Sequence, residues 1–407
     1  MIFKIAWRNI YRNKKRSLIT ISSIFAALFL IILMRALQFG FYDKLIETVV
    51  ESYAGYVEVH ADGFWDNQSL DNSMEVDQSL LDNIKTVDGV DNIVQRLQTF
   101  TLISMGNKTK GGVINGINIS DEQKITDWSK KMVSGTFDIN DNEIIVGKGI
   151  AEYFDVKEND TLILYGQGYR GMMAAGKYPV AGVIDLKNPD LNKLGIFMTI
   201  ESARSYVSSD DISTHIIIDK ERYYDEIKIV NDLSQTLPED YEIMTWKETL
   251  PEIEQTITAD SAGGLIMAFI LYVIVIFGMF GTVLMMTEER KYEFGVLISI
   301  GMSRVRLFGI ILIETVILSM IGVALAVIIT HPICYYYNLN PIDMAVLMGD
   351  GADQMMQELG FSPIAPMSIS WSIPLTHALV IFISSMIISI YPAIKISKLD
   401  PVKSMKI

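Results

Sequence analysis

Four long runs of apolar residues constrain the fold of this 407-residue chain more than any other feature. They cover residues 18–37, 263–286, 307–329 and 373–391. A helix of about twenty residues is roughly 30 Å long, which is the thickness of the hydrocarbon core of a bilayer. Because lipid offers no partner for backbone polar groups, each run is predicted to be a transmembrane helix.

Charged residues are divided sharply between short segments and one long domain. Residues 1–16, the 287–306 loop and the C-terminal tail together carry 14 basic residues. Residues 38–264 carry 19 basic and 39 acidic residues. Short basic segments stay in the cytoplasm, whereas long domains are translocated largely regardless of their charge. Both termini are therefore predicted to be cytoplasmic and the acidic domain to lie outside. The net charge of −14 argues against nucleic-acid binding.

These patterns predict an α-helical membrane protein with four transmembrane helices and a large extracytoplasmic α+β domain inserted between the first and second. The expected segments are an amphipathic elbow helix (1–16), the first span (17–37), the outer domain with stalk helices (38–262), the second span (263–286), a cytoplasmic coupling loop (287–306), the third span (307–331), an outer loop (332–371), the fourth span (372–392), which stops at Pro392, and a cytoplasmic tail (393–407). The elbow could equally be the positive flank of a signal anchor.

Within the outer domain, short runs of period two alternate with short helical patterns. The expected strands are 55–60, 100–104, 112–118, 143–146, 161–165, 178–185, 196–199 and 215–219, and the expected helices are 77–87, 149–154, 200–207 and 224–235. The glycine-rich segment 166–176 is predicted to be a mobile loop. It is not a phosphate-binding loop, since no Lys-Ser or Lys-Thr pair follows its glycines at the required spacing.

Two charges fall inside the predicted spans. Arg35 lies near the outer end of the first span and is expected to extend to the headgroups. Glu314 lies about 10 Å from the cytoplasmic end of the third span, where a carboxylate is costly unless it is paired or protonated. It is either a functional group or a carboxylate close enough to the interface to reach water or Arg304.

The loop between the second and third spans has helical character of its own. Phe294, Leu297 and Ile298 recur at offsets of zero, three and four residues, which predicts a short helix on the membrane face. A helix in that place can be pushed by a cytoplasmic partner, although its Glu288–Lys291 run could also be a charged helix end at the headgroups.

Catalytic and metal-binding patterns are not found in the sequence. Cys334 is the only cysteine, and the four histidines lie far apart. The sequence has no GxxxxGK[ST] motif. The chain is therefore expected to bind no metal and not to be an enzyme by itself.

Four motifs in order resemble the FtsX-like/MacB-like (type VII) ABC transporter permeases over nearly the whole chain. They are WRNIYRNKKRSLIT at the N-terminus, EIIVGKGIAEYFDVKENDTLILYG at 143–166, TEERKYEFGVLISIGMSRVRL at 287–307 and YPAIKISKLDPVKSMK at 391–406. MRALQFGFYDKL at 34–45 is more similar to the lipoprotein-releasing (Lol-type) permeases, through Gly40, Phe41 and Leu45.

The resemblance implies a bacterial inner-membrane permease that works with two copies of a cytoplasmic ATPase and with a second permease, identical or paralogous. ATP and Mg²⁺ would be bound by the ATPase, so no cofactor is expected in this chain. The function implied is lipoprotein release toward the outer membrane, with a periplasmic lipoprotein carrier as a further possible partner. A MacB-like exporter with an adaptor protein, or an FtsX-like activator of a cell-wall hydrolase, are the alternatives.

On this interpretation the ATPase would contact a set of residues in the loop: Glu289, Glu293, Phe294, Gly295, Leu297, Gly301 and Arg304. Apolar residues of the first two spans would contact the acyl chains of the substrate: Ile24, Leu28, Ile31, Met34, Met267, Leu271, Ile274 and Phe277. These stripes could instead be ordinary lipid-facing or helix-packing surface.

Overall fold

The computed structural model describes residues 2–186, 188–221, 224–344 and 363–398, together with the single residues 346, 349, 351 and 356. The chain divides into two compact units. The first comprises the described parts of 1–43, 256–343 and 364–407, and the second comprises those of 44–255 and 344–363. Residues 399–407, which include part of the predicted tail and of the fourth motif, lie outside the described residues, as does much of the outer loop.

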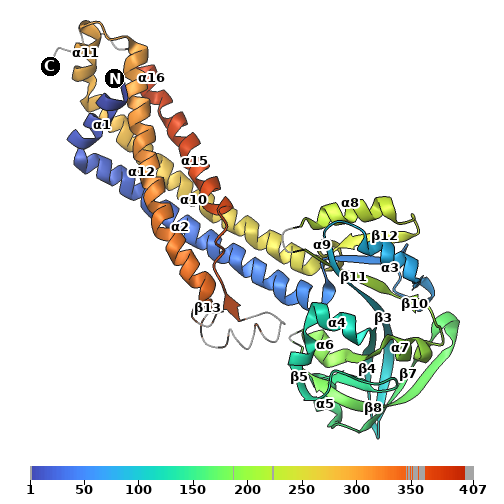
Figure 1. Cartoon of the computed structure of the whole chain (residues 1–407). Helices are drawn as coiled ribbons and strands as arrows, with labels where there is room; N and C mark the ends of the chain where they lie inside the picture. The colour runs from blue at the N-terminus through green and yellow to red at the C-terminus, as the bar shows by residue number, and fades with distance from the viewer. Residues whose placement is uncertain are drawn as a thin grey trace. The chain divides into compact units, whose positions relative to one another are not determined.

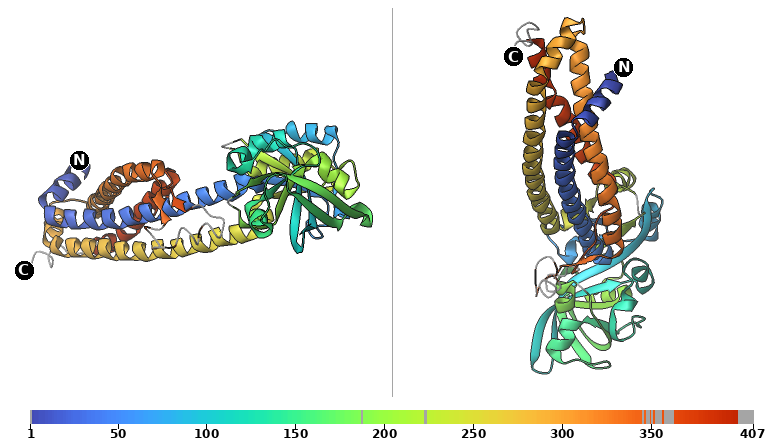
Figure 2. Two further views of the ribbon diagram at one scale, coloured as in Figure 1. Left: turned by 90° about the horizontal axis from the view of Figure 1, so that it is seen from below. Right: turned by 90° about the vertical axis from the view of Figure 1, so that its left-hand side faces the viewer.

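The first unit is a bundle of helices (Figures 1 and 2). In chain order its helices are α1 (Ile2–Arg12), α2 (Lys14–Ile46), α10 (Pro251–Glu289), α11 (Lys291–Ser299), α12 (Arg304–Leu339), α15 (Ser372–Ile388) and α16 (Ile390–Ser397). A two-residue antiparallel pair, β13 (Ile342–Asp343) with β14 (Ile364–Ala365), follows α12.

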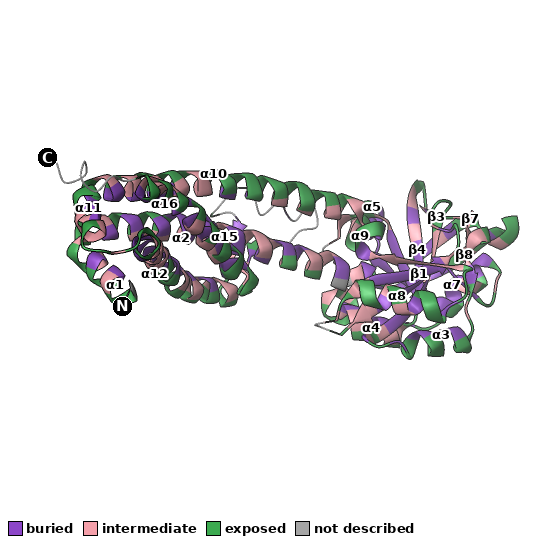
Figure 3. Cartoon of the chain, turned by 90° about the horizontal axis from the view of Figure 1, so that it is seen from above, coloured by how far each residue is buried: buried purple, intermediate pink, exposed green. Residues whose placement is uncertain are grey.

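Among the residues that the structure describes, four helices are long and apolar enough to cross a membrane. They cover Lys14–Val50, Pro251–Glu289, Arg304–Leu339 and Ser372–Ser397. A shared core of buried side chains holds them together, with Ile24 and Leu28 from α2, Val275 from α10 and Ile381 from α15 among its members. The most apolar stretch of α10 is only 22% buried, against 50% for that of α12. Figure 3 shows the exposed faces of α10 in green.

α10 runs from Pro251 to Glu289, so the predicted stalk and the second span lie on one continuous helix. The fourth span does not stop at Pro392, because the break falls at Ser389 and Pro392 lies in the first turn of α16. A proline is tolerated there because the first N–H groups of a helix have no intrahelical partner.

Gly40 has a packing role that the motif comparison did not reveal. A Cβ at this position would overlap the backbone of Pro366 and Ser368. The same segment is fixed on α2 by a hydrogen bond from the Ser368 N–H to the Ala36 carbonyl (2.8 Å). A glycine in this place therefore serves the close approach of two backbones, whatever the substrate.

The second unit is an α/β domain built on a ten-stranded sheet. Its strands are β1 (Val57–Ala61), β3 (Val90–Met105), β4 (Lys108–Ile117), β5 (Met132–Gly135), β6 (Ile144–Gly147), β7 (Thr161–Gln167), β8 (Met173–Ile184), β9 (Gly195–Thr199), β11 (His215–Lys220) and β12 (Tyr241–Thr245), with a separate pair of β2 (Met74–Glu75) and β10 (Ile212–Ser213). Its helices are α3 (Gln78–Lys85), α4 (Ile119–Thr126), α5 (Lys148–Phe154), α6 (Pro189–Leu194), α7 (Ile200–Val207), α8 (Glu226–Thr236) and α9 (Trp246–Thr249), and a π-helix covers Glu47–Ala54.

β3 belongs to two lobes at once. Its second half joins a closed circuit of six strands, β3-β4-β9-β6-β8-β7, which we call the six-strand lobe. Its first half pairs with β11, which continues through β1 to β12 and forms what we call the three-strand lobe. Each lobe has its own core, represented by Leu164 and Val180 in the first and by Val59 and Ile229 in the second.

The prediction of a mobile loop at 166–176 is wrong. These residues form a β-hairpin, in which Gly166 pairs with Ala174 and the Gly168 N–H donates to the Met172 carbonyl (2.7 Å). Gly166 lies so close to the Phe100 carbonyl that a Cβ would be 3.0 Å from its oxygen. Glycine here permits close packing of β7 on β3, which composition alone cannot distinguish from flexibility.

Acidification is expected to destabilise the second unit through His215. Its buried imidazole lies 6.0 Å from that of His60 (ring centroids), and burial, with His60 and Arg96 nearby, holds the His215 pKa well below 6.5. Below pH 6.5 the unfolded chain takes up a proton that the folded chain does not, so stability falls by up to about 1.4 kcal/mol per pH unit. Thermal unfolding between pH 7.5 and 5 should show this slope in the native chain and a smaller one in His215→Gln. An unchanged slope in the variant would contradict the assignment.

Candidate functional site

α10 and α12 are joined by a short helical segment whose shape depends on one glycine. α11 ends where the Gly301 and Met302 N–H groups donate to the carbonyls of Ile298 and Leu297, each at 3.0 Å. Gly301 has a φ of +98°, in the left-handed region that favours glycine. The Ser303 hydroxyl then caps the first turn of α12. Gly301 is therefore required by the turn itself.

The inner face of α11 is held by apolar packing. The buried cluster consists of Phe294, Leu307, Ile311 and Ile396, with Leu297 half-buried against it. Phe294 is 1% exposed, and the adjoining Gly295 is also buried. Three of the predicted ATPase contacts, Phe294, Gly295 and Leu297, thus face inward and fix α11 on its neighbours.

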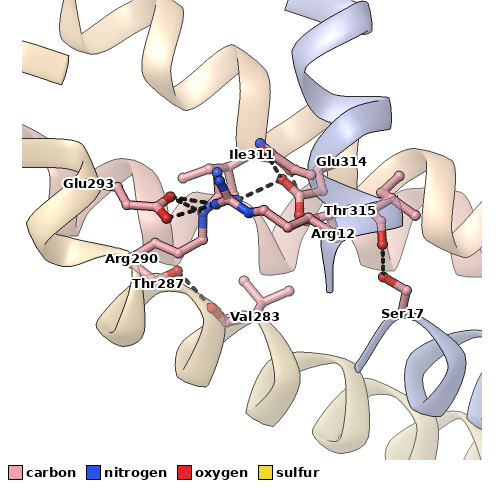
Figure 4. Close-up of polar contacts among 11 residues, drawn as sticks. Arg12, Ser17, Val283, Thr287, Arg290, Glu293, Ile311, Glu314 and Thr315 are labelled. Atoms are coloured by element: carbon pink, nitrogen blue, oxygen red, sulfur yellow. Dashed lines mark hydrogen bonds and ion pairs between the residues drawn. The ribbon is translucent and has the colours of Figure 1, made fainter. Parts of the chain in front are cut away.

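A chain of ion pairs joins this loop to α1 and α12 (Figure 4). Arg290 contacts Glu314 through Nη1 and Oε2 at 2.9 Å and Glu293 through Nε and Oε2 at 3.2 Å. Nη2 of Arg12 donates to both carboxylate oxygens of Glu293, at 2.7 and 2.8 Å. Asn9 Nδ2 donates to Glu314 Oε2 at 3.4 Å. The polar side chains of three helices therefore converge on Arg290 and Glu314.

The other acidic residues of the segment are also paired across helices. Glu289 forms an ion pair with Arg16 of α2, and Glu288 forms one with Lys395 of α16. The Glu288–Lys291 run is thus more than a charged helix end, because its carboxylates join the loop to the two chain ends. Glu289 and Glu293, predicted to contact an ATPase, bind cations of this chain.

Burial separates the strong contacts of the network from the weak ones. The side chain of Glu314 is 1% exposed and that of Arg290 is 8% exposed, so removing either partner would leave a buried charge unpaired. Arg12 and Glu293 are about half exposed, where an ion pair contributes up to about 1 kcal/mol. Burial raises the pKa of Glu293, but hydrogen bonds from Arg12 and Arg290 outweigh it and hold the pKa below its usual range.

Two expectations about charges in the spans are corrected. Glu314 pairs with Arg290, not with Arg304, whose Nη1 donates to the Ser397 carbonyl at 2.8 Å. Arg35 does not extend to the headgroups, since it is 5% exposed and its Nη1 contacts Gln38 Oε1 (2.5 Å) and the Ser261 carbonyl (3.4 Å). Arg290 and the Ser261 carbonyl are distant in sequence from Glu314 and Arg35, so hydropathy alone could not identify these contacts.

The predicted substrate-contacting residues fall into three groups by exposure. Ile24, Leu28 and Ile31 of α2 are at most 1% exposed, and Met34 of α2 and Leu271 of α10 are half-buried. Met267, Ile274 and Phe277 of α10 are 50%, 62% and 69% exposed, so only these three are largely accessible on the surface of the single chain. Their contact with a substrate remains a prediction.

The outward face of the loop carries apolar residues that sequence reasoning missed. Tyr292, Ile300 and Val305 are 52%, 74% and 79% exposed. These three exposed apolar side chains lie on a segment rich in charged residues and are candidates for contact with a partner. In the sequence, these residues could have been recognised because they do not fall at the helical spacing of Phe294, Leu297 and Ile298. Among the residues that the structure describes, no three His, Cys, Asp or Glu side chains are placed to hold a metal ion.

The comparisons with known proteins agree with this architecture. Residues 265–401 match the family of FtsX-like permease C-terminal domains. Two curated relatives, the macrolide export ATP-binding/permease proteins MacB of two Campylobacter jejuni strains, are each 22% identical over 370 residues, which is 85% of this chain and 55% of the relative. The chain thus spans about half the length of these relatives.

Solved structures similar to part of the chain include the periplasmic region of MacB from Actinobacillus actinomycetemcomitans, which covers 52% of this chain and 98% of that one at 12% identity and a TM-score of 0.37. The extracellular domain of YknZ from Gram-positive bacteria covers 47% of this chain and all of that one at 15% identity and a TM-score of 0.32. TM-scores this far below 0.5 do not establish a shared fold.

Among the residues that the structure describes, four helices are able to cross a membrane, and a large α/β domain lies between the first and the second in the sequence. Residues 265–401 are an FtsX-like permease C-terminal domain, and the chain is similar over 85% of its length to the MacB proteins.

Proposed function

We propose that this chain transmits the motion of a cytoplasmic ATPase to its α/β domain on the other side of a bacterial inner membrane, with both termini in the cytoplasm. The observation that carries the proposal is the ion-paired loop, in which Arg290 and Glu314 join α10, α11 and α12 while Arg12 adds α1. A push on α11 would be shared at once by three helices. ATP hydrolysis would take place in two copies of the ATPase, bound to a pair of permeases.

The ATPase would bind the outward face of the loop and not its ion pairs. Ile300→Glu together with Val305→Glu should abolish co-purification of the ATPase, because two exposed apolar contacts become charged. Glu293→Lys should leave the complex assembled but lower substrate-stimulated turnover about fivefold, since the lost pair with Arg12 and new repulsion from Arg290 cost about 1 kcal/mol.

A charge swap provides the control for Glu293. Adding Arg12→Glu to Glu293→Lys rebuilds one ion pair of opposite polarity and should restore part of the lost turnover, while the repulsion from Arg290 remains. If Glu293→Lys left substrate-stimulated turnover unchanged, the ion pairs would have no part in coupling. If the Ile300 and Val305 substitutions left the complex intact, the ATPase would bind elsewhere.

For the substrate we favour lipoproteins, released from the membrane toward the outer membrane. Their acyl chains already lie in the outer leaflet, where the exposed face of α10 with Met267, Ile274 and Phe277 could receive them. Drawing an acyl chain out of lipid costs about 0.8 kcal/mol per CH₂ exposed to water, which explains the need for ATP. The exposed sheet face with Phe100, Tyr165 and Met173 is a candidate surface for a lipoprotein carrier.

Photo-crosslinking in cells tests this substrate class. A photoreactive residue at Ile274 or Phe277 should capture lipoproteins, whereas the same residue at Ile328 of α12 or Leu375 of α15, which are 67% and 63% exposed, should capture only lipid. Equal capture at all four sites would contradict the proposal. Depletion of the chain should also leave outer-membrane lipoproteins in the inner membrane.

A second candidate is export of a small compound or peptide with an adaptor protein, favoured by the similarity to the two MacB proteins. In that case an adaptor would co-purify with the chain and lipoprotein sorting would survive depletion. The sequence features that favour lipoproteins are weaker than they first seem, because Gly40 is explained by its packing on Pro366.

A further inference from the structure

A hollow of about 120 Å³ lies in the second unit among α3, α4, α7 and β3. Its apolar lining is Leu81, Ile93 and Ile200, each less than 10% exposed. Leu81 and Ile93 belong to the core of the three-strand lobe, and Ile200 belongs to that of the six-strand lobe. The hollow is therefore formed where the two lobes meet within this unit.

Charges of both signs surround this apolar lining. Lys85 and Arg204 supply the positive charge, and Asp121 and Glu201 the negative charge. The half-buried Arg204 uses neutral acceptors only: Nε donates to the Ile212 carbonyl (3.0 Å), and Nη2 donates to Gln95 Oε1 and Ser213 Oγ (3.3 Å each).

Three of these four charges have no ion-pair partner. Within the described ranges, none of the three residues Lys85, Arg204 and Glu201 forms an ion pair. Asp121 is paired through Oδ1 with Nζ of Lys124 at 2.7 Å. A guanidinium that keeps its charge at a half-buried place without a carboxylate in contact is available to an outside partner. The Glu201 carboxylate is exposed and likewise has no cation in contact among the described residues.

We propose that this hollow binds a small zwitterion with an apolar body, of the class of the aliphatic α-amino acids. Arg204 and Lys85 would bind its carboxylate, Glu201 its ammonium group, and Leu81, Ile93 and Ile200 its side chain. A simple anion is disfavoured because residues 38–264 carry 39 acidic against 19 basic residues, while a zwitterion has no net charge to be repelled. The small volume, about 120 Å³, limits the ligand to one with a short aliphatic side chain such as that of valine.

Such a ligand would connect the two lobes. Lys85 ends α3, which packs in the three-strand lobe, and Arg204 lies on α7, which packs in the six-strand lobe. A bound carboxylate shared by both cations would hold α3 and α7 together. Binding would therefore reduce motion between the lobes.

The test is a titration of the purified full chain in lipid nanodiscs with L-valine and with its two halves. Isovalerate lacks the ammonium group and isobutylamine lacks the carboxylate. Valine at millimolar concentration should bind, as measured by saturation-transfer NMR and by a rise in the thermal unfolding midpoint, and each half should bind at least about tenfold more weakly.

Variants show whether binding takes place in the hollow. Lys85→Met changes an exposed side chain and cannot unfold the domain, yet it should weaken valine binding, as should Arg204→Met and Glu201→Gln. Lys148→Met, on an exposed ion pair outside the hollow, is the matched control and should bind as the native chain does. No valine binding, equal binding of valine and its halves, or binding unaffected by Lys85→Met and Glu201→Gln would each overturn the proposal.

Discussion

Replacing Glu314 by methionine is expected to lower the free energy of unfolding of the helix bundle by about 3 kcal/mol. Arg290 would then remain buried without its nearest carboxylate, and only the half-exposed Glu293 would still contact it. The measurement is thermal or denaturant unfolding of the purified chain in nanodiscs. Arg12→Gln, which breaks an exposed pair, should cost less than about 1 kcal/mol and is the comparison.

The double variant Arg290→Met/Glu314→Met separates stability from coupling. Buried ion pairs can often be replaced by apolar residues without loss of stability, so the double variant should regain most of what Glu314→Met loses. It should nevertheless show reduced substrate-stimulated ATP turnover, because α12 would no longer be joined to the loop through Arg290. Full coupling in a stable double variant would mean that the buried pair serves folding alone.

The second large effect is expected at Arg96 in the α/β domain. Its guanidinium and the Glu122 carboxylate are 1% and 0% exposed and form two contacts, at 2.6 and 3.1 Å. Nη1 also donates to the Tyr53 carbonyl at 2.6 Å. Burial lowers the pKa of Arg96, but Glu122 and Tyr53 outweigh it and raise the pKa overall.

Arg96→Met should therefore cost about 4 kcal/mol and lower the unfolding midpoint of this domain by about 10 °C, because it leaves Glu122 buried and unpaired. Lys148→Met, which breaks the exposed pair with Asp185, should change the midpoint by no more than a few degrees. Hydrogen exchange of β3 in the full chain reports the same effect locally. A midpoint within a few degrees of the native value in Arg96→Met would show that Glu122 finds another partner or becomes protonated.

Local patterns predicted most of the architecture. Apolar runs located the four long helices, because the bilayer imposes a length that few other contexts require. Alternation of buried and accessible positions matches strand β7, one side of which faces a core. β9 and β11 are instead short apolar runs that are buried on both sides. The helix at Phe294, Leu297 and Ile298 was found for the same reason.

Contacts between distant parts of the chain could not be predicted in this way. Nothing near Arg12 in the sequence indicates Glu293, and nothing near Arg35 indicates the Ser261 carbonyl. Glycine posed a related difficulty. Gly166 and Gly40 allow backbones to approach, whereas Gly301 permits a positive φ, and only the surroundings distinguish these roles.

The pairing of Arg12 with Glu293 also sets an order for biosynthesis. The two residues are 281 positions apart, so the ribosome finishes the first long before it reaches the second. At about 5–20 residues per second, the delay is roughly 15–60 s. During that interval Arg12 has no Glu293 to pair with. The end of the bundle that carries the ion-paired loop is thus completed late in synthesis, after the α/β domain has been made.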